Sequence, residues 1–185
     1  MFNSKKTIAI ILLISILVLS GCIKDTGPKI NDNSDNTSSG IGNINLDSMV
    51  ILENLPPGFE YLGSLPINDY DEFSENIIKS KEGTYRDEDN FDVFLDIVEL
   101  DTDASATDFI LNYTSQYEQL SAGDRFTNIN FNGHIATRIK TYTLMDGNQL
   151  PKYQIIWNNN NLVFIVRSNS YLENSSMNLA IATGY

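Results

Sequence analysis

Four short stretches in the C-terminal third of the chain alternate apolar and polar residues, and turn sequences separate them. Asn132-Gly133 joins the first stretch to the second, and Asp146-Gly147 marks the next reversal. Such dipeptides favour the two-residue turns of β-hairpins, because both of their residues tolerate positive φ. Four consecutive asparagines at 158–161 form the third turn. The pattern predicts a meander of four antiparallel strands over residues 126–131, 135–143, 153–157 and 162–167.

The segments around this meander predict the elements that pair with it or cover it. Residues 60–67 and 91–100 read as strands, and the second is partly apolar on both faces, as a central strand is. Apolar side chains recur at helical spacing over residues 103–122, which predicts an amphipathic helix. Shorter helices are expected over residues 71–79 and 170–183.

These elements together predict an α+β domain. Its antiparallel sheet has about five to six strands, including the C-terminal four-strand meander, and two amphipathic helices cover it. Ser105 followed three residues later by Asp108 is similar to a capping box at the start of the longest helix, and Gly123 ends that helix.

The N-terminus has the pattern of a secretory signal. Lys5 and Lys6 precede an apolar run over residues 7–19. Thirteen helical residues span about 20 Å, whereas a bilayer core of about 30 Å needs roughly 20 residues. The run is therefore the length of a signal-peptide core, and we expect residues 1–21 to be removed. The alternative is an uncleaved single membrane-spanning helix.

The run ends in Leu19-Ser20-Gly21-Cys22, which resembles the lipobox of prokaryotic lipoproteins. The resemblance implies that Cys22 is lipidated and becomes the mature N-terminus. Lipobox, polar spacer and element order together resemble lipoproteins of archaea. The element order alone is similar to the PsbP/Mog1-like group of photosystem and nuclear-import proteins, a likeness that transfers no site.

Residues 22–48 read as a flexible polar tether, and residues 49–185 as a single domain. Asn, Ser, Asp and Gly make up 16 of the 26 residues from 23 to 48. Such a segment buries too little apolar surface to offset the entropy of ordering. Both interpretations of the N-terminus place the domain outside the cell membrane, anchored through Cys22 or through one spanning helix.

Composition narrows the classes of function. The chain carries 24 acidic and 12 basic residues, a net charge of −12 that becomes −14 without residues 1–21. This acidity argues against nucleic-acid binding, which needs a basic surface. One Cys and one His exclude disulfide frameworks and metal sites built from several histidines. No motif places a nucleophile beside a base, so we expect no enzyme activity and no cofactor other than a possible Ca²⁺.

Acidic residues concentrate in residues 69–103, which hold 13 of the 24. Asp87, Asp89 and Asp92 supply the hard oxygen ligands that Ca²⁺ prefers, but the loop lacks the EF-hand glycine. We therefore weigh two interpretations of the 87–103 region, a calcium or small-ligand module and a solvated acidic loop that keeps the protein soluble. A calcium titration followed by thermal melting distinguishes them.

Three further features are candidate sites. The sequons at Asn36, Asn112 and Asn174 could accept glycans on an exported chain. His134 follows a predicted turn and reads as an exposed hairpin residue. Arg138, Lys140 and Tyr142 share one strand face, a basic surface that could meet an acidic partner or glycan, or be an ordinary polar sheet face.

The sequence thus predicts a membrane-anchored surface lipoprotein. Its domain would act as a binding or accessory module, with an envelope protein as a possible partner.

Overall fold

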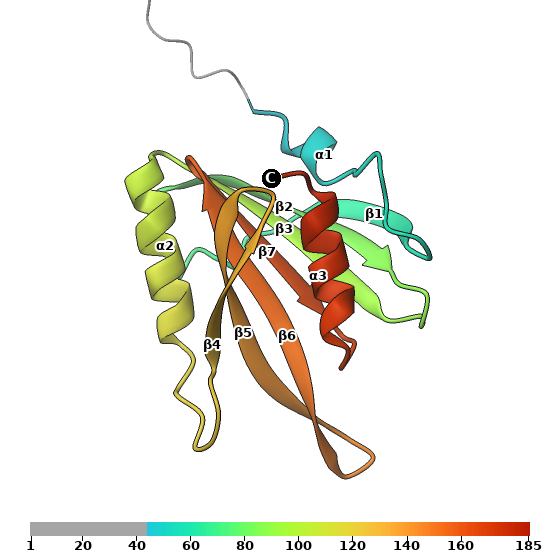
Figure 1. Cartoon of the computed structure of the whole chain (residues 1–185). Helices are drawn as coiled ribbons and strands as arrows, with labels where there is room; N and C mark the ends of the chain where they lie inside the picture. The colour runs from blue at the N-terminus through green and yellow to red at the C-terminus, as the bar shows by residue number, and fades with distance from the viewer. Residues whose placement is uncertain (1–43) are drawn as a thin grey trace, which may run out of the picture. The chain divides into compact units, whose positions relative to one another are not determined.

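The computed structural model describes residues 44–185, which form one antiparallel sheet of seven strands with three helices (Figure 1). The strand order across the sheet is β1-β2-β3-β7-β6-β5-β4. The α+β class predicted from the sequence is confirmed. The elements in chain order are α1 (Leu46–Met49), β1 (Glu60–Pro66), β2 (Ile77–Arg86), β3 (Asp92–Leu100), α2 (Asp103–Ser115), β4 (Phe126–Phe131), β5 (His134–Met145), β6 (Asn148–Asn159), β7 (Leu162–Ser168) and α3 (Glu173–Ala182).

The sheet consists of two meanders that meet at its centre. Strands β1 to β3 form the first and β4 to β7 the second, and β3 pairs with β7 from Val93↔Ser168 to Glu99↔Leu162. The predicted four-strand meander and the central position of β3 are therefore correct.

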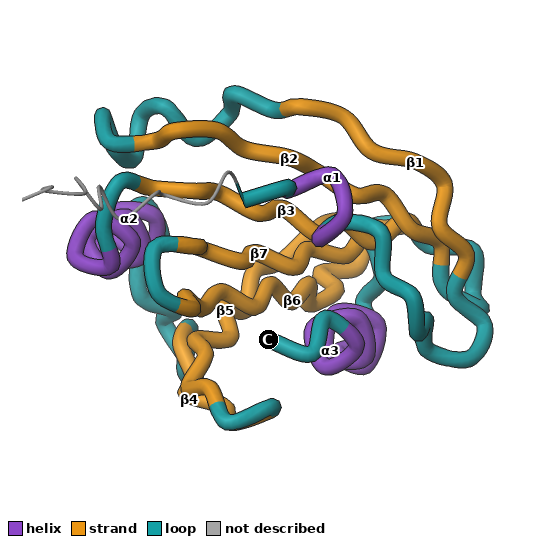
Figure 2. The backbone as a smooth tube through the Cα atoms, turned by 90° about the horizontal axis from the view of Figure 1, so that it is seen from above, coloured by secondary structure: helices purple, strands orange, loops and turns teal. Residues whose placement is uncertain are grey.

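Helices cover both faces of the sheet. Helix α2 packs on one face through Ala106, Phe109 and Tyr113, and α3 packs on the other through Leu179 and Ala180, together with α1 (Figures 1 and 2). Residues of β3 alternate between the two faces, with Ile97 facing α3 and Val98 facing α2. Burial on both sides explains the nearly continuous apolar run of β3 and β7.

The sheet has more strands than predicted, because residues 71–79 do not form the expected helix. They form turns that lead into β2, which begins at Ile77 and pairs with β3 along its whole length. In those turns the Ser74 hydroxyl accepts a hydrogen bond from the Asn76 amide, and Phe73 packs against Phe109 and Tyr113 of α2. Side-chain bonds of this kind compete with helix formation.

Helix α2 begins as predicted but is capped differently and ends earlier. Its N-cap is Thr102, whose hydroxyl accepts the Ser105 amide at 3.1 Å, so the capping box expected at Ser105 is wrong. The helix ends at Ser115 instead of continuing to residue 122. The hairpin turn is as predicted: Asn132 and Gly133 have φ of 50° and 82°.

The described chain before residue 49 packs against the sheet, although the sequence assigned it to the tether. Leu46, the first residue of α1, is buried in the core, and Lys79 of β2 donates a hydrogen bond to the Ile44 carbonyl. A Cβ on Gly83 would lie 2.7 Å from the Val50 carbonyl oxygen, so glycine permits the close approach of this segment. No helix within residues 44–185 has the length and apolar content needed to cross a bilayer.

Candidate functional site

The most exposed large hydrophobic side chain of the described residues, Leu144, lies on a hairpin that extends past the neighbouring strands, here called the arm (residues 140–153). Strand β4 pairs with β5 only as far as Ile139, and β7 pairs with β6 only as far as Gln154. Six further β5–β6 pairs, from Lys140↔Tyr153 to Met145↔Asn148, continue without a third strand. At about 3.4 Å per residue the arm is about 17 Å long.

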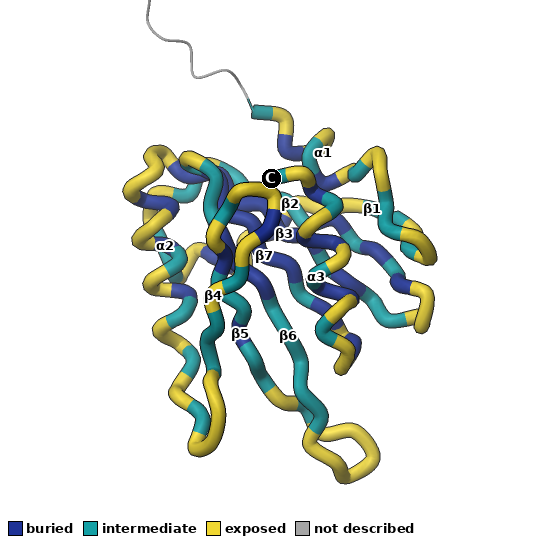
Figure 3. Tube along the Cα trace, viewed as in Figure 1, coloured by how far each residue is buried: buried dark blue, intermediate teal, exposed yellow. Residues whose placement is uncertain are grey.

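The far end of the arm is coloured as exposed in Figure 3. Leu144 is 74% exposed, Tyr142 43% and Met145 39%. A two-stranded hairpin that no other element packs against is only marginally stable in water. Tyr142 and Leu144 share one face of the arm, and apolar side chains exposed together in this way make that face a candidate contact surface.

The cations without an acidic partner gather at the base of the arm. Among residues 44–185 there are eight Lys and Arg side chains, and five of them form ion pairs with Asp or Glu. The remaining three are Arg125, Lys140 and Lys152. Arg125 donates to the Glu118 and Lys140 carbonyls, and Lys140 lies 5.4 Å from the centre of the Tyr142 ring. A domain that is strongly acidic thus presents uncompensated positive charge at one place.

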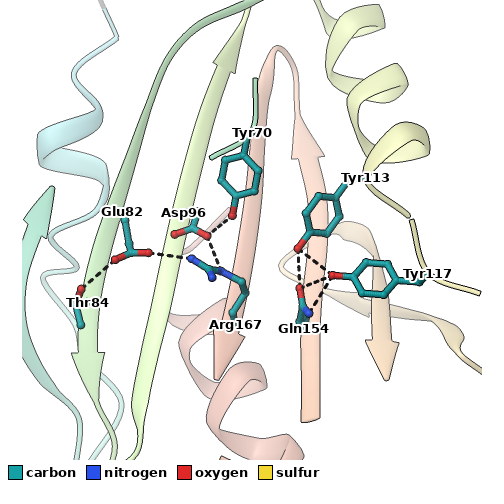
Figure 4. A network of polar contacts seen from close by, with 8 residues as sticks. All are labelled: Tyr70, Glu82, Thr84, Asp96, Tyr113, Tyr117, Gln154 and Arg167. Carbon is teal, nitrogen blue, oxygen red and sulfur yellow. Dashed lines mark hydrogen bonds and ion pairs between the residues drawn. The ribbon is translucent and has the colours of Figure 1, made fainter. Parts of the chain in front are cut away.

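A second polar cluster lies inside the molecule, on the face that α2 partly covers (Figure 4). Arg167 of β7 donates from Nε to Asp96 Oδ2 at 2.8 Å and from Nη2 to Glu82 Oε2 at 2.9 Å. The Tyr70 hydroxyl, from the loop before β2, also donates to Asp96 Oδ2. Asp96 is fully buried, and its second oxygen Oδ1 has no hydrogen-bond partner within the described chain.

Burial shifts the acid–base behaviour of this cluster. Desolvation and the nearby Asp96 carboxylate raise the pKa of Glu82 above its ordinary value. The same two causes raise the pKa of Tyr70 beyond the range in which it could ionise. Burial lowers the pKa of Arg167, but Asp96 and Tyr70 outweigh that effect and leave it raised. The cluster therefore holds one firm positive charge between two acids and links β2, β3, β7 and the 70s loop.

A neighbouring network connects α2 with the sheet. The Tyr113 hydroxyl donates to the Gln154 amide oxygen at 2.7 Å, and Tyr117 exchanges bonds with the same amide (Figure 4). Desolvation, together with Tyr117, raises the pKa of Tyr113, which keeps it a neutral donor. Its role is to anchor the C-terminal half of α2.

The proposed calcium ligands do not converge. Both oxygens of Asp87 are used, Oδ1 by the amides of Asp89 and Phe91 and Oδ2 by the Ser175 hydroxyl of α3. Asp92 pairs with Arg86 at 2.8 Å. No group of three or more His, Cys, Asp or Glu side chains within residues 44–185 is arranged to hold a metal ion.

The other predicted site residues are scattered. His134 is half-buried at the start of β5, and Asn174 is exposed in the first turn of α3. Asn112 is exposed on α2, where its amide donates to the Phe73 carbonyl at 3.0 Å. Cys22, Asn36 and the segment 1–21 lie outside the described residues.

Sequence reasoning found part of the arm and missed the rest. It placed Arg138, Lys140 and Tyr142 on one face, but Arg138 forms an ion pair with Glu173 and so is not free. Leu144 and Lys152 were missed because their exposure depends on where β4 and β7 end. The available signal was the length of the alternation before Asp146-Gly147, because β5 has 12 residues whereas β4 has 6 and β7 has 7.

A scan of protein-family models and searches of curated proteins and of solved structures gave no match.

Proposed function

We propose that the protein is a surface lipoprotein without enzymatic activity, a binding or accessory module that presents the arm to an envelope protein outside the cell. In this proposal residues 1–21 are the signal peptide, Cys22 carries the lipid, and the chain up to residue 43 connects the lipid to the domain. The supporting sequence observation is Leu19-Ser20-Gly21-Cys22 after an apolar run of signal-peptide length.

The structural observation that carries the proposal is the position of the arm. The described chain starts at Ile44, whose carbonyl accepts a hydrogen bond from Lys79 of β2. Across the sheet, Lys79 lies opposite Glu99 of β3, and Glu99 lies opposite Leu162 of β7. Leu162 in turn pairs with Asn159 at the end of β6. The tip of the arm lies where β6 begins, so it points away from the start of the described chain (Figure 1). An attachment at the N-terminal end of the domain would therefore leave the arm accessible to another protein.

Anchoring is tested with Cys22→Ser in cells that export the protein. Without the thiol that accepts the lipid, we expect loss of processing at residue 22 and release or mislocalisation of the chain. Unchanged processing and membrane retention would instead support the single-span alternative.

Exposure and engagement of the arm are tested together with introduced cysteines. Leu144→Cys and Ile135→Cys form a matched pair, because these side chains are 74% and 72% exposed on the same strand. Both should react with a membrane-impermeant maleimide if the domain faces outward, and the wild-type chain, whose one cysteine is Cys22, gives the blank.

We expect the thiol at residue 144 to react several-fold more slowly than the one at residue 135 on intact cells. The difference should disappear in detergent, when the partner dissociates. Equal rates at both positions before and after solubilisation would contradict a partner on the arm.

A further inference from the structure

The outer edge of β5 in the arm carries backbone groups that no other strand of residues 44–185 pairs with. The Lys140 amide donates to the Arg125 carbonyl of the segment leading into β4, at 2.8 Å. Alternate residues of an antiparallel strand direct their backbone groups to the same edge, so those of Tyr142 and Leu144 point the same way as those of Lys140. Strand β4 does not extend that far, and no strand of residues 44–185 occupies the position.

The two edges of the arm differ in their ability to accept another strand. Pro151 lies opposite Tyr142, and its nitrogen, which carries no hydrogen, is on the outer edge of β6. Proline on an edge strand prevents strand addition, because it removes a donor from the ladder. The β5 edge from Lys140 to Met145 contains neither proline nor an acidic residue. It is the open edge of the arm.

The charges and side chains around this edge define the occupant. The Arg125 guanidinium, bonded to the Lys140 carbonyl at 2.7 Å, lies where the path of β4 would continue along the arm. Lys140 and Lys152 occupy successive cross-strand pairs and therefore opposite faces of the arm. Lys152 Nζ donates to Asn169 Oδ1 just after β7, at 3.1 Å, so the cations that an added strand with acidic side chains would meet are Lys140 on one face and Arg125 at its end. Along β5, the side chains of Tyr142 and Leu144 offer apolar contacts to such a strand.

We infer that the outer edge of β5 beyond Lys140, at residues 141–145, binds an acidic, extended segment of the partner protein by strand addition. In this mode the main-chain hydrogen bonds supply affinity and the flanking cations supply selectivity for acidic sequences. The inference rests on the proposed function, because it names the kind of partner that the arm contacts.

The test uses the chain purified from exporting cells in nonionic detergent, with or without a lipid, and a synthetic twelve-residue peptide in which glutamate alternates with valine and threonine. A counterpart with lysine in place of every glutamate is the control peptide. Two proline variants form a matched pair, because Leu144 and Gln149 face each other in one cross-strand pair and direct their amides to opposite edges. Binding is measured by fluorescence anisotropy.

We expect the acidic peptide to bind and the lysine peptide to bind at least roughly tenfold more weakly. Leu144→Pro should weaken binding by roughly tenfold or more, since it removes one main-chain hydrogen bond and obstructs the edge, whereas Gln149→Pro should change it by less than about twofold. Equal effects of the two variants, equal binding of the two peptides, or no binding of either would each overturn the inference.

Hydrogen exchange on the chain without a proline substitution tests the inference even if a proline variant fails to fold. The acidic peptide should slow exchange of the Tyr142 and Leu144 amides and leave the Gln149 amide unchanged. Protection of Gln149 alone, or of none of the three, would overturn it. A dimer of the peptide-free chain that Leu144→Pro abolishes would also overturn it, by making a second copy the occupant. None of these measurements depends on Cys22, so their failure is distinct from failure of anchoring.

Discussion

At the scale of single residues, Asp96 shows how the chain tolerates a charge in its core. A carboxylate removed from water is stable only when ion pairs and hydrogen bonds replace its hydration. Arg167 and Tyr70 supply those bonds to one oxygen, while the other has no partner within the described residues. The arrangement implies that Asp96 depends strongly on Arg167.

Removing Arg167 should therefore cost more than removing the Tyr70 hydroxyl. We expect Arg167→Met to lower the free energy of unfolding by about 3 kcal/mol at neutral pH, because it leaves buried Asp96 without a counter-charge. Tyr70→Phe should cost about 1–2 kcal/mol, the penalty for one lost hydrogen bond to a charged group. Urea denaturation measures both values. A smaller effect of Arg167→Met than of Tyr70→Phe would contradict this account of the cluster.

The pKa of Glu82 makes stability depend on pH in a defined direction. Burial and Asp96 raise this pKa above its ordinary value of 4.5. At pH values between the pKa of Glu82 in the unfolded chain and its pKa in the folded chain, the folded chain therefore binds more protons than the unfolded chain. The contribution of Glu82 is complete below the unfolded pKa and is lost as pH rises through the folded pKa. Glu82→Gln cannot titrate and removes this dependence.

We therefore expect the free energy of unfolding of Glu82→Gln, minus that of the wild type, to increase as pH rises from about 4 through the folded pKa of Glu82. Taking the difference cancels the contributions of the other carboxylates. A difference that stays constant with pH would show that Glu82 titrates alike in both states.

At the scale of elements, the cap of α2 is the clearest test. Thr102→Ala removes the hydroxyl that accepts the Ser105 amide and should cost about 1 kcal/mol. Asp108→Ala, at the exposed position that the sequence assigned to the cap, should change stability by less than about 0.5 kcal/mol. Thermal unfolding of the two variants compares them directly. A larger loss in Asp108→Ala would restore the predicted capping box.

Elements were predictable from the sequence where local pattern and tertiary packing agree. The hairpin at Asn132-Gly133 follows from local turn chemistry, and β3 follows from a pattern that burial on both sides preserves. The turns and strand within residues 71–86 were not predictable, because spaced apolar residues such as Phe73 and Ile77 fit a helix equally well. Only pairing of β2 with β3 decides between the two, and that pairing is not local.

At the scale of the whole molecule, substitutions can test whether the folded domain begins before residue 49. Leu46→Ala should lower the free energy of unfolding by about 2 kcal/mol, because Leu46 is 4% exposed in the core. Asp47→Ala, in an ion pair whose acid is largely exposed, should cost less than about 1 kcal/mol. Denaturation of both variants of the mature chain provides the comparison. Equal, small effects would place the functional start of the domain near residue 49, as the sequence predicted.

The distribution of charge over the molecule was only partly predictable. The sequence located the acidic excess in residues 69–103, but it could not show that Asp96 and Glu99 turn inward to pair with Arg167 and Lys79. Likewise the sequence placed Arg138 and Lys140 on one strand face but could not show that only Lys140 lacks an acidic partner. Pairing between residues far apart in sequence decides both points, so Arg125 and Lys152 emerged only from the fold.

The junction of β3 with β7 has a consequence for how the chain acquires its structure. Each meander can form from contacts close in sequence, but the junction joins residues about 60 to 75 positions apart, and such long-range closure slows folding. A chain emerging N-terminus first would complete β1 to β3 while β3, a strand buried on both faces, still lacked its neighbour. Until β7 arrives, that edge could pair with other chains, and chaperones that shield nascent strands would act at this stage.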